Sequence, residues 1–181
     1  MKVSELGMVH IYTGEGKGKT TAAIGLGIRC LGAGLRVTMV SFLKNPGSSE
    51  FCALSRFAPQ FQFIIANQKP RGFYWKLSPE EKTEIFKDYQ AAYIQIQEII
   101  MQQVCEVLIL DEIMAVLKYG IFPVESVLQI IQQCRERQIE LILTGRNAPL
   151  AVLDAADLVT EMKEIKHPMA NGTRARKGIE Y

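Results

Sequence analysis

Residues 8–21 read MVHIYTGEGKGKTT, a short apolar run that passes into glycines and lysines and then into a helix-forming segment. Glycine permits backbone angles that are closed to other residues, so successive N–H groups of this loop can turn toward one anionic oxygen. Lys19 adds a point charge, the hydroxyl of Thr20 can bind Mg²⁺, and the N-terminus of the next helix attracts negative charge. The stretch therefore predicts a loop, between a strand and a helix, that binds the phosphates of a nucleoside triphosphate.

The loop departs from the common phosphate-loop pattern at one position. That pattern has a glycine five residues before the glycine of Gly-Lys-Thr, and the residue here is Thr13, with Gly14 one place later. A chance Gly-Lys-Thr in a turn is the alternative, but the flanking strand and helix and the three closely spaced glycines argue against it. We predict that the nucleotide contacts the whole loop, namely Gly14, Glu15, Gly16, Lys17, Gly18, Lys19, Thr20 and Thr21.

Apolar runs rich in β-formers alternate along the chain with longer segments of helical period, which is the pattern of a parallel sheet with helices on both faces. Because the phosphate-binding loop follows the first strand, the pattern predicts an α/β, three-layer fold of the RecA-like P-loop NTPase class, with a mainly parallel sheet of about six strands. The predicted strands span residues 8–13, 36–42, 61–66, 106–111, 139–144 and 157–162.

Three helices have clear boundaries in the sequence. The first follows the phosphate-binding loop and is predicted to end near residues 32–34, where glycine can close a helix. A long helix runs from the capping sequence at 78–81 to about residue 103, and another runs from near Pro123 to about residue 137. The length of 181 residues fits a single domain that spans residues 1–181.

Composition excludes several classes of protein. The 21 Lys and Arg residues nearly balance the 19 Asp and Glu residues, and the net charge of +2 gives no electrostatic case for a nucleic-acid partner. The four cysteines are far apart, so neither a disulfide framework nor a zinc site is expected, and each cysteine is predicted to be a buried thiol. No targeting segment and no membrane-spanning apolar run is evident, so we expect a cytoplasmic protein without membrane contact.

A second chemical signal is the apolar stretch 107–110, which ends in the adjacent carboxylates Asp111 and Glu112. In phosphate-loop proteins an acidic residue at the end of this strand helps to hold Mg²⁺, directly or through water. The alternative is that one of the two only caps the next helix. Because the pair accompanies Lys19 and Thr20, we favour the metal role, although spacing leaves open which carboxylate contacts the ion.

Further candidates lie in polar stretches predicted as loops at the carboxyl ends of strands, among them 43–50 and 67–78, because open α/β sheets bind ligands at that edge. Arg146 follows the strand 139–144 and can reach a phosphate or a ribose, the alternative being a solvated surface arginine. The segment 72–75 contains three consecutive aromatic residues, which cannot all face inward. At least one is expected to project as a platform for a flat apolar ligand, unless the group forms a hydrophobic hinge under the long helix.

These residues together resemble the ATP:corrinoid adenosyltransferases of the CobA type, which attach an adenosyl group to the cobalt of vitamin B12 and its precursors. The resemblance runs from about Val9 to Tyr181, and the family shares the displaced glycine of the phosphate-binding loop. Its markers are YTGEGKGKTTAA at 12–23, GFYW at 72–75, LDE at 110–112, TGR at 144–146, ADLVTE at 156–161, KHP at 166–168 and KGIEY at 177–181.

The resemblance implies how the nucleotide is used. Members of the family bind MgATP with the polyphosphate reversed, so that the ribose C5′ faces the second substrate, a reduced corrinoid. Carried over to this chain, residues 14–20 would wrap the triphosphate, Thr20 and Glu112 would hold Mg²⁺, and Arg146 would help to fix the nucleotide. Lys19, Thr20 and Glu112 are the implied catalytic residues.

The resemblance also implies a corrinoid site. Phe73 and Trp75 match the aromatic pair that lies by the lower face of the corrin and helps to displace the lower axial ligand, which eases reduction of Co(II) to Co(I). Co(I) would attack C5′ in line, and inorganic triphosphate would depart. A reduced, flavodoxin-like flavoprotein is the implied electron donor, and the family favours a homodimer.

Two departures from the family pattern stand out. Glu15 replaces an asparagine often found in the loop, and a carboxylate there repels a triphosphate unless it turns outward or meets Mg²⁺ or an arginine. Few residues precede the first predicted strand, so the N-terminal segment that helps to close the site in longer members is expected to be shorter or missing.

Two other functions stay open from the sequence. One is a different P-loop ATPase or small-molecule kinase, which would need a base or a water-positioning residue near the terminal phosphate. The other is a non-catalytic nucleotide or corrinoid sensor. Neither the preferred corrinoid nor a role in synthesis or salvage follows from the residues.

Overall fold

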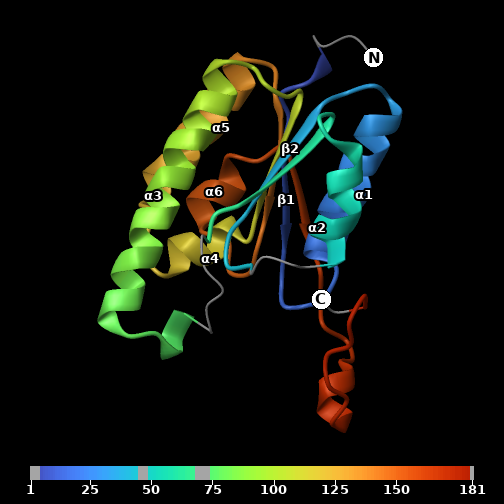
Figure 1. Cartoon of the computed structure of the whole chain (residues 1–181), viewed down its shortest axis with the longest axis vertical. Coiled ribbons are helices and arrows are strands. Elements are labelled where there is room, and N and C mark those ends of the chain that lie inside the picture. Colours follow the sequence, from blue (N-terminus) through green and yellow to red (C-terminus); the bar gives the residue numbers. More distant parts are fainter. Residues whose placement is uncertain (1–4, 45–48, 68–73, 180–181) are drawn as a thin grey trace.

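The computed structural model describes residues 5–44, 49–67 and 74–179, and its centre is a six-stranded sheet in the order β3-β2-β4-β5-β1-β6 (Figure 1). All five strand pairs are parallel, so the carboxyl ends of the strands share one edge. Each predicted strand is confirmed to within one residue at either end. The observed bounds are β1 Val9–Thr13, β2 Val37–Ser41, β3 Phe61–Ile65, β4 Val107–Asp111, β5 Glu140–Thr144 and β6 Leu158–Glu161.

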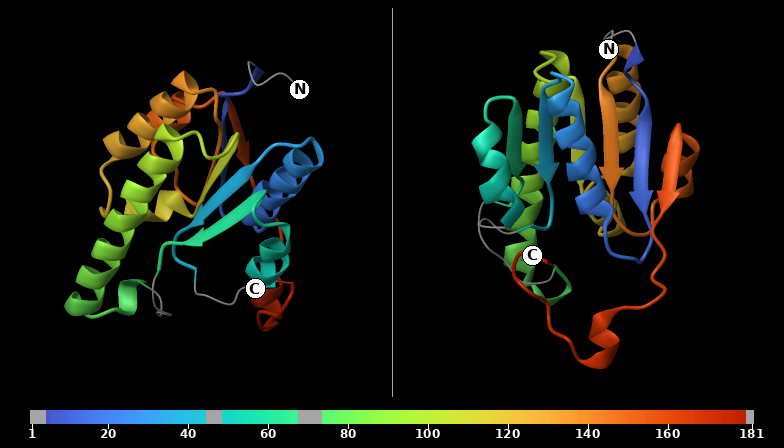
Figure 2. Two further views of the ribbon diagram at one scale, coloured as in Figure 1. Left: turned by 45° about the horizontal axis from the view of Figure 1, so that its top comes forward. Right: turned by 90° about the vertical axis from the view of Figure 1, so that its right-hand side faces the viewer.

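Helices cover both faces of the sheet, which confirms the predicted three-layer α/β architecture. One face carries α1 (Lys19–Gly32) and α2 (Ser49–Leu54), and the other carries the remaining helices (Figures 1 and 2). These are α3 (Pro79–Met101), α4 (Ile113–Lys118), α5 (Val124–Glu136) and α6 (Leu150–Asp154), and short 3₁₀ turns span Ser55–Phe57, Tyr74–Lys76 and Pro168–Asn171.

The predicted capping sequence begins α3 as expected. The hydroxyl of Ser78 accepts a hydrogen bond from the Glu81 N–H, and the Glu81 carboxylate accepts one from the Ser78 N–H. The short helices α2, α4 and α6 have no periodic signal of their own, because each is only five or six residues long.

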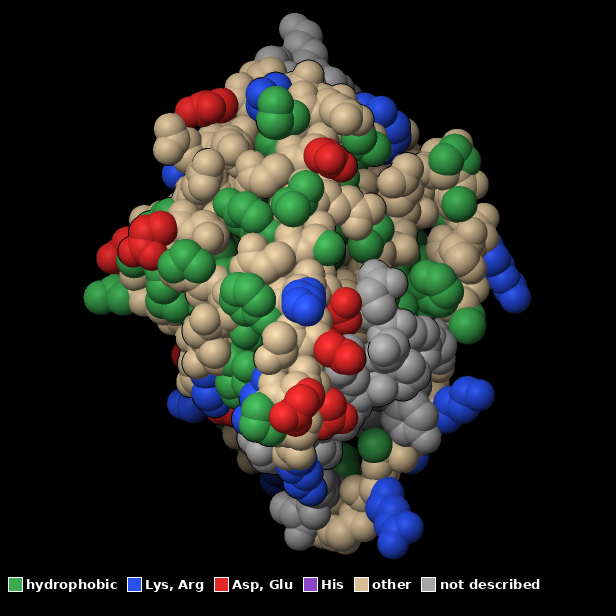
Figure 3. All heavy atoms as spheres, turned by 60° about the vertical axis from the view of Figure 1, so that its left-hand side comes forward, with side chains coloured by type: hydrophobic (Ala, Val, Ile, Leu, Met, Phe, Trp, Pro, Cys, Tyr) green, Lys and Arg blue, Asp and Glu red, His purple; other side chains and the backbone are tan. Residues whose placement is uncertain are grey.

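The core consists of two apolar layers, one on each side of the sheet. On β4, Ile109 packs in the layer under α1, while Leu108 and Leu110 pack in the larger layer under α3 and α5. Every residue of β4 is buried, as expected for a central parallel strand covered on both faces. The outer surface of α3 carries scattered apolar side chains among polar and charged ones (Figure 3). Among the residues of α3, Phe86, Ile94 and Met101 are exposed.

The cysteines only partly match their prediction. Cys105 and Cys134 are buried and Cys30 is half-buried, whereas Cys52 is exposed on α2, a surface helix that buries Leu54 instead. All four are free thiols. None of the helices in the described ranges has the length and apolar character of a membrane span.

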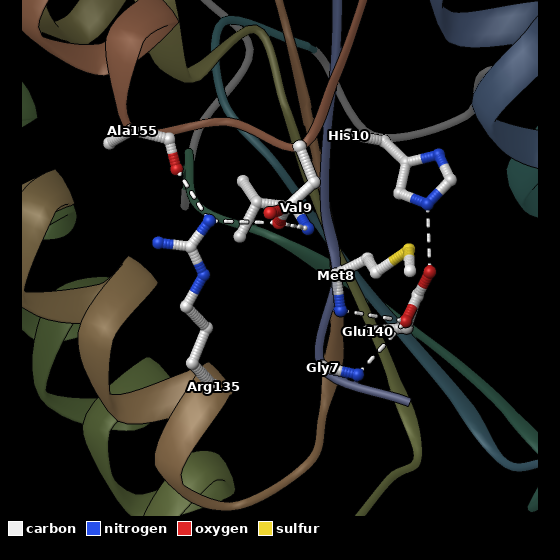
Figure 4. Close-up of polar contacts among 8 residues, drawn as sticks. Gly7, Met8, Val9, His10, Arg135, Glu140 and Ala155 are labelled. Carbon is white, nitrogen blue, oxygen red and sulfur yellow. Dashed lines mark hydrogen bonds and ion pairs between the residues drawn. The ribbon is translucent and has the colours of Figure 1, made fainter. Parts of the chain in front are cut away.

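At the amino edge of the sheet, Glu140 ties β5 to the start of β1 (Figure 4). Its carboxylate accepts hydrogen bonds from the N–H groups of Gly7 and Met8, each at 3.0 Å, and contacts His10 Nε2 at 2.7 Å. Burial alone would raise the pKa of Glu140, but these hydrogen bonds outweigh it and the pKa is lowered.

Asp157 makes the matching connection between β1 and β6. Its Oδ2 accepts a hydrogen bond from the Val9 N–H and another from Arg135 of α5, each at 2.8 Å. The amino edge is therefore fixed by side chains, while the opposite edge carries the loops that form the candidate site.

Candidate active site

The phosphate-binding loop connects β1 to α1 and rests against the chain that follows β6. The Gly16 N–H donates to the Met162 carbonyl at 2.7 Å, and the Met162 N–H donates to the Thr13 carbonyl at 2.8 Å. A Cβ atom at Gly14 or Gly16 would approach the Met162 carbonyl oxygen to 2.5 or 2.7 Å. Only glycine fits at these two positions, which explains their place in the motif.

The N-terminus of α1 faces the site. Gly18 has φ 118° and directly precedes the helix, where no side chain caps the first turn and no acidic residue lies within it. The first N–H groups of a 14-residue helix thus form an anion-binding end.

Lys19 is folded back into its own loop. The residue is only 6% exposed, and Nζ donates to the carbonyls of Gly14 at 2.6 Å and Gly16 at 2.7 Å. Burial lowers the pKa of Lys19, and the charge of Arg146 acts in the same direction. The two carbonyls hold the ammonium group within the loop.

Asp111 joins four elements at the carboxyl edge of the sheet. It is fully buried at the end of β4, and its Oδ1 accepts hydrogen bonds from the hydroxyls of Thr20 and Thr144, each at 2.7 Å. Its Oδ2 accepts a third from the hydroxyl of Ser41 at 3.0 Å. The three hydroxyls thus donate to both oxygens of the carboxylate and link β4 to α1, β5 and β2.

Glu112 turns into the cavity instead of capping α4. Its backbone is left-handed, with φ 60°, and its N–H donates to the Thr144 hydroxyl at 2.9 Å. Although it occupies the position before α4, its side chain makes no capping hydrogen bond. Burial and the adjacent Asp111 carboxylate raise the pKa of Glu112, while the charge of Lys19 opposes them.

A cavity of about 660 Å³ lies between these groups. It brings together most of the predicted site residues from the loop, β4 and the loop after β5. Its lining comprises Glu15, Gly16, Lys17, Gly18, Lys19, Thr20, Thr21, Ile24, Lys44, Ser49, Glu50, Glu112, Arg146, His167, Gly178 and Ile179.

Arg146 and Glu15 form an ion pair at the rim of this cavity. Arg146 Nη1 lies 2.8 Å from Glu15 Oε2, and the two side chains are 57% and 58% exposed. The preceding Gly145 has φ 138°, and a Cβ atom there would come within 2.7 Å of Met114 Cβ. The carboxylate that sequence reasoning placed beside the phosphates thus meets an arginine.

The cavity also contains residues that no motif identifies. Lys44 and Glu50 approach from the stretch after β2, which the sequence places at the ligand edge without naming a residue. His167 and Ile179 come from the C-terminal tail, which passes below the carboxyl ends of the strands (Figure 2). Lys17 Nζ donates to the Ile179 carbonyl at 2.8 Å, so the tail contacts the phosphate-binding loop.

The structure does not test the two predicted corrinoid residues. Phe73 and the side chain of Trp75 lie outside the described part of the chain, so their roles stay predictions. Tyr74 between them stacks on Tyr119, with ring centroids 4.2 Å apart, and packs against the core.

Comparison with known proteins identifies the family. The family model described as ATP:corrinoid adenosyltransferase BtuR/CobO/CobP matches residues 5–181. The chain belongs to this family. The match includes every candidate site residue, from the phosphate-binding loop to the C-terminal tail.

Individual relatives of this adenosyltransferase family member cover nearly its whole length. It is 32% identical to the corrinoid adenosyltransferase of Pseudomonas aeruginosa over 98% of this chain and 85% of the relative. It is 30% identical to that of Escherichia coli K12 over 98% of this chain and 87% of the relative. The flagellar accessory protein FlaH of Methanocaldococcus jannaschii shares the fold, with a TM-score of 0.55 and 17% identity over 86% of this chain and 71% of that one.

Proposed function

We propose that the cavity binds MgATP and presents its ribose C5′ to Co(I) of a reduced corrinoid. Family membership assigns the chain an ATP-dependent adenosylation of corrinoids. The observation that carries the proposed site is the chain of hydrogen bonds through Thr20, Asp111, Thr144 and Glu112, because it joins the phosphate-binding loop to the acidic pair.

Thr20 and Glu112 are the proposed protein ligands of Mg²⁺. A hydroxyl and a carboxylate are oxygen donors of the kind that Mg²⁺ prefers, and this ion usually takes its other ligands from phosphates and water. The Thr20 hydroxyl donates its proton to Asp111, which leaves its lone pairs for the ion. Asp111 itself accepts three hydroxyl protons, so it orients Thr20 while Glu112 faces the cavity.

The loop and its neighbours are the proposed triphosphate site. The N–H groups at the start of α1 and the ammonium of Lys19 supply positive charge, and Lys19 exchanges the carbonyls of Gly14 and Gly16 for phosphate oxygens. Arg146 exchanges Glu15 for the nucleotide in the same way. Gly14 to Thr21 and Arg146 are therefore the residues that we propose to bind ATP.

The reaction needs alignment and charge stabilisation more than proton transfer. As the Co–C5′ bond forms, the bond from C5′ to the bridging oxygen breaks, and triphosphate leaves with that electron pair. The loop N–H groups, Lys19 and Arg146 stabilise the charge that gathers on the leaving group. Mg²⁺ held by Thr20 and Glu112 would neutralise part of the same charge.

Further proposals follow from the family resemblance. Phe73 and Trp75 contact the lower face of the corrin, and a reduced flavoprotein supplies the electron that forms Co(I). We also propose a single domain over residues 1–181, a homodimer and a cytoplasmic location.

An anaerobic assay with MgATP and chemically reduced cob(I)alamin tests the function. We expect a cobalt–carbon bond and inorganic triphosphate. ADP and phosphate without that bond would contradict the proposal and point to an ATPase or kinase, while tight binding without turnover would point to a sensor. Phe73→Ala with Trp75→Ala should impair Co(II) reduction and adenosylation but retain ATP binding.

A further inference from the structure

Lys44 is a cation of the cavity that no sequence motif identifies. It lies two residues beyond Phe42, just past the end of β2, and forms an ion pair with Glu50 of α2. Its Nζ is 3.6 Å from Asp111 Oδ2, and its side chain is 22% exposed and lines the cavity. The ammonium therefore lies between a buried carboxylate and the space where the phosphates are proposed to bind.

A strained turn presents Lys44 to this space. Leu43 has φ 57°, a left-handed conformation that is unfavourable for a bulky residue. The turn is held in place because the Leu43 N–H donates to the buried Tyr89 hydroxyl at 2.8 Å, and the Phe42 N–H donates to the Asp111 carbonyl at 3.0 Å. Backbone strain of this kind clusters at ligand sites, where it fixes the direction of a side chain.

Lys44 is also a counter-ion of Asp111, but that ion pair is not a hydrogen bond. At 3.6 Å the ammonium is too far from Oδ2 for a hydrogen bond, and that oxygen already accepts from Ser41. An ammonium group has three donors, and among the described residues its close partner is Glu50. Within the described part of the chain, the remaining donors are available to a ligand in the cavity.

The position of Lys44 complements that of Lys19. β4 and β5 separate β2 from β1 in the sheet, so Lys44 and the phosphate-binding loop approach the cavity from different strands. The start of α1 reaches across to β4 through the contact of Thr20 with Asp111. A triphosphate at the N-terminus of α1 would therefore have Lys19 on one side and Lys44 on the other.

We propose that Lys44 is a second phosphate-binding cation of the site, and that Glu50 holds its ammonium in place until a phosphate oxygen replaces the carboxylate. This role rests on the proposed function, because the anion it binds is the triphosphate that departs when the cobalt–carbon bond forms. Lys44 would stabilise negative charge on the leaving group from the side opposite Lys19.

Calorimetric titration of the full chain with Mg²⁺ and inorganic tripolyphosphate tests the proposal without a corrinoid. We expect Lys44→Met to weaken tripolyphosphate binding about 10- to 100-fold, the range for a lost charge-assisted hydrogen bond, and Lys44→Arg to retain most of it. Lys118→Met, which removes an exposed lysine of α4 outside the cavity, is the matched control and should bind as the wild type does.

The Glu50→Gln variant provides a second, independent test of the proposal. Removing a carboxylate that competes with phosphate should tighten tripolyphosphate binding several-fold, and the gain should vanish when Lys44 is also replaced by Met. If Lys44→Met fails to fold, the Glu50→Gln variant decides alone, and unchanged or weaker binding overturns the proposal.

Wild-type affinity in Lys44→Met together with a lower melting temperature would make Lys44 only a counter-ion of Asp111 and overturn the proposal. A wild-type chain that binds no tripolyphosphate overturns it as well. A chain that binds tripolyphosphate through Lys44 but forms no adenosylcorrinoid supports the role of Lys44 and contradicts the proposed function, so the two failures are distinguishable.

Discussion

The hydroxyl of Thr20 donates to Asp111 Oδ1 at 2.7 Å, which joins the first turn of α1 to the end of β4. The same oxygen accepts from Thr144, whose own hydroxyl oxygen accepts the Glu112 N–H. Two motifs that are about ninety residues apart in sequence therefore form one hydrogen-bonded unit. Within it, Asp111 sets the position of Thr20, and Glu112 faces the cavity.

Glu112→Gln should lower the rate of adenosylation about 100-fold or more. A neutral amide is a weaker ligand for Mg²⁺ than a carboxylate, so the ion would be held less tightly beside the departing triphosphate. The rate at saturating MgATP and its dependence on Mg²⁺ concentration measure this effect. Glu125→Gln, an exposed acid in the first turn of α5, is the control. A normal Mg²⁺ dependence in Glu112→Gln, with its loss in Asp111→Asn, would assign the ion to Asp111.

Thr144→Val should destabilise the fold by about 1–3 kcal/mol, because it removes one of the three hydrogen bonds to the buried Asp111 carboxylate and leaves the Glu112 N–H without its hydroxyl acceptor. Urea denaturation of the variant and the wild type measures the difference in their free energies of unfolding. Thr144→Ser retains the hydroxyl and should recover most of the loss. Equal stability of the valine variant and the wild type would show that the two hydrogen bonds contribute nothing net.

Glu15→Asn should tighten ATP binding several-fold, because it removes a negative charge beside the triphosphate and releases Arg146 for the nucleotide. Both side chains are more than half exposed, so the free energy of unfolding should change by less than about 1 kcal/mol. Calorimetry at low and high salt measures the affinity, and the gain should shrink as salt screens the charge. Weaker binding would mean that Glu15 orients Arg146 for the nucleotide.

Gly16→Ala should abolish most ATP binding, because the added methyl group would lie 2.7 Å from the Met162 carbonyl oxygen and force the loop to move. Gly25→Ala in α1 is a matched control, since nothing lies within 4 Å of its Cβ position. That change should leave binding intact and stabilise the helix by roughly 0.5–1 kcal/mol. Equal ATP affinities for the two variants would contradict the packing of the loop on Met162.

Glu140→Gln should destabilise the protein by about 1–3 kcal/mol at neutral pH, because Glu140 accepts hydrogen bonds from two N–H groups and contacts His10. The folded-state pKa of Glu140 is lowered, so its stabilising effect is present above the ordinary glutamate value and is lost as the pH falls through the lowered pKa. Urea unfolding from pH 7 to pH 3 should show the two proteins converging in acid. A difference independent of pH would contradict this assignment.

The sheet and its edges are predictable from sequence because buried parallel strands read as continuous apolar runs. Val107 to Leu110 and Leu141 to Leu143 are such runs, and both are fully buried. The short helix α4 is not predictable in the same way, because Ile113–Lys118 is too short to show a helical period.

The site is predictable only where chemistry is concentrated in a motif. The loop and the acidic pair are found from residue types at fixed spacing, and the family resemblance selects Glu112. The separate tasks proposed for Asp111 and Glu112 depend on the hydrogen bonds that Asp111 accepts from Thr20, Ser41 and Thr144. Lys44 could not be identified from the sequence, because its position depends on the left-handed turn at Leu43 and leucine does not predict such a turn.

The bond that breaks in ATP tests the central claim most directly. ATP labelled with ¹⁸O at the oxygen that bridges C5′ and the α-phosphorus should be incubated anaerobically with the enzyme, Mg²⁺ and cob(I)alamin, and the products analysed by mass spectrometry. Attack at C5′ predicts that the label appears in inorganic triphosphate and that the adenosyl group is carried by cobalt without it. Label retained in ADP, with phosphate released and no cobalt–carbon bond, would contradict the account.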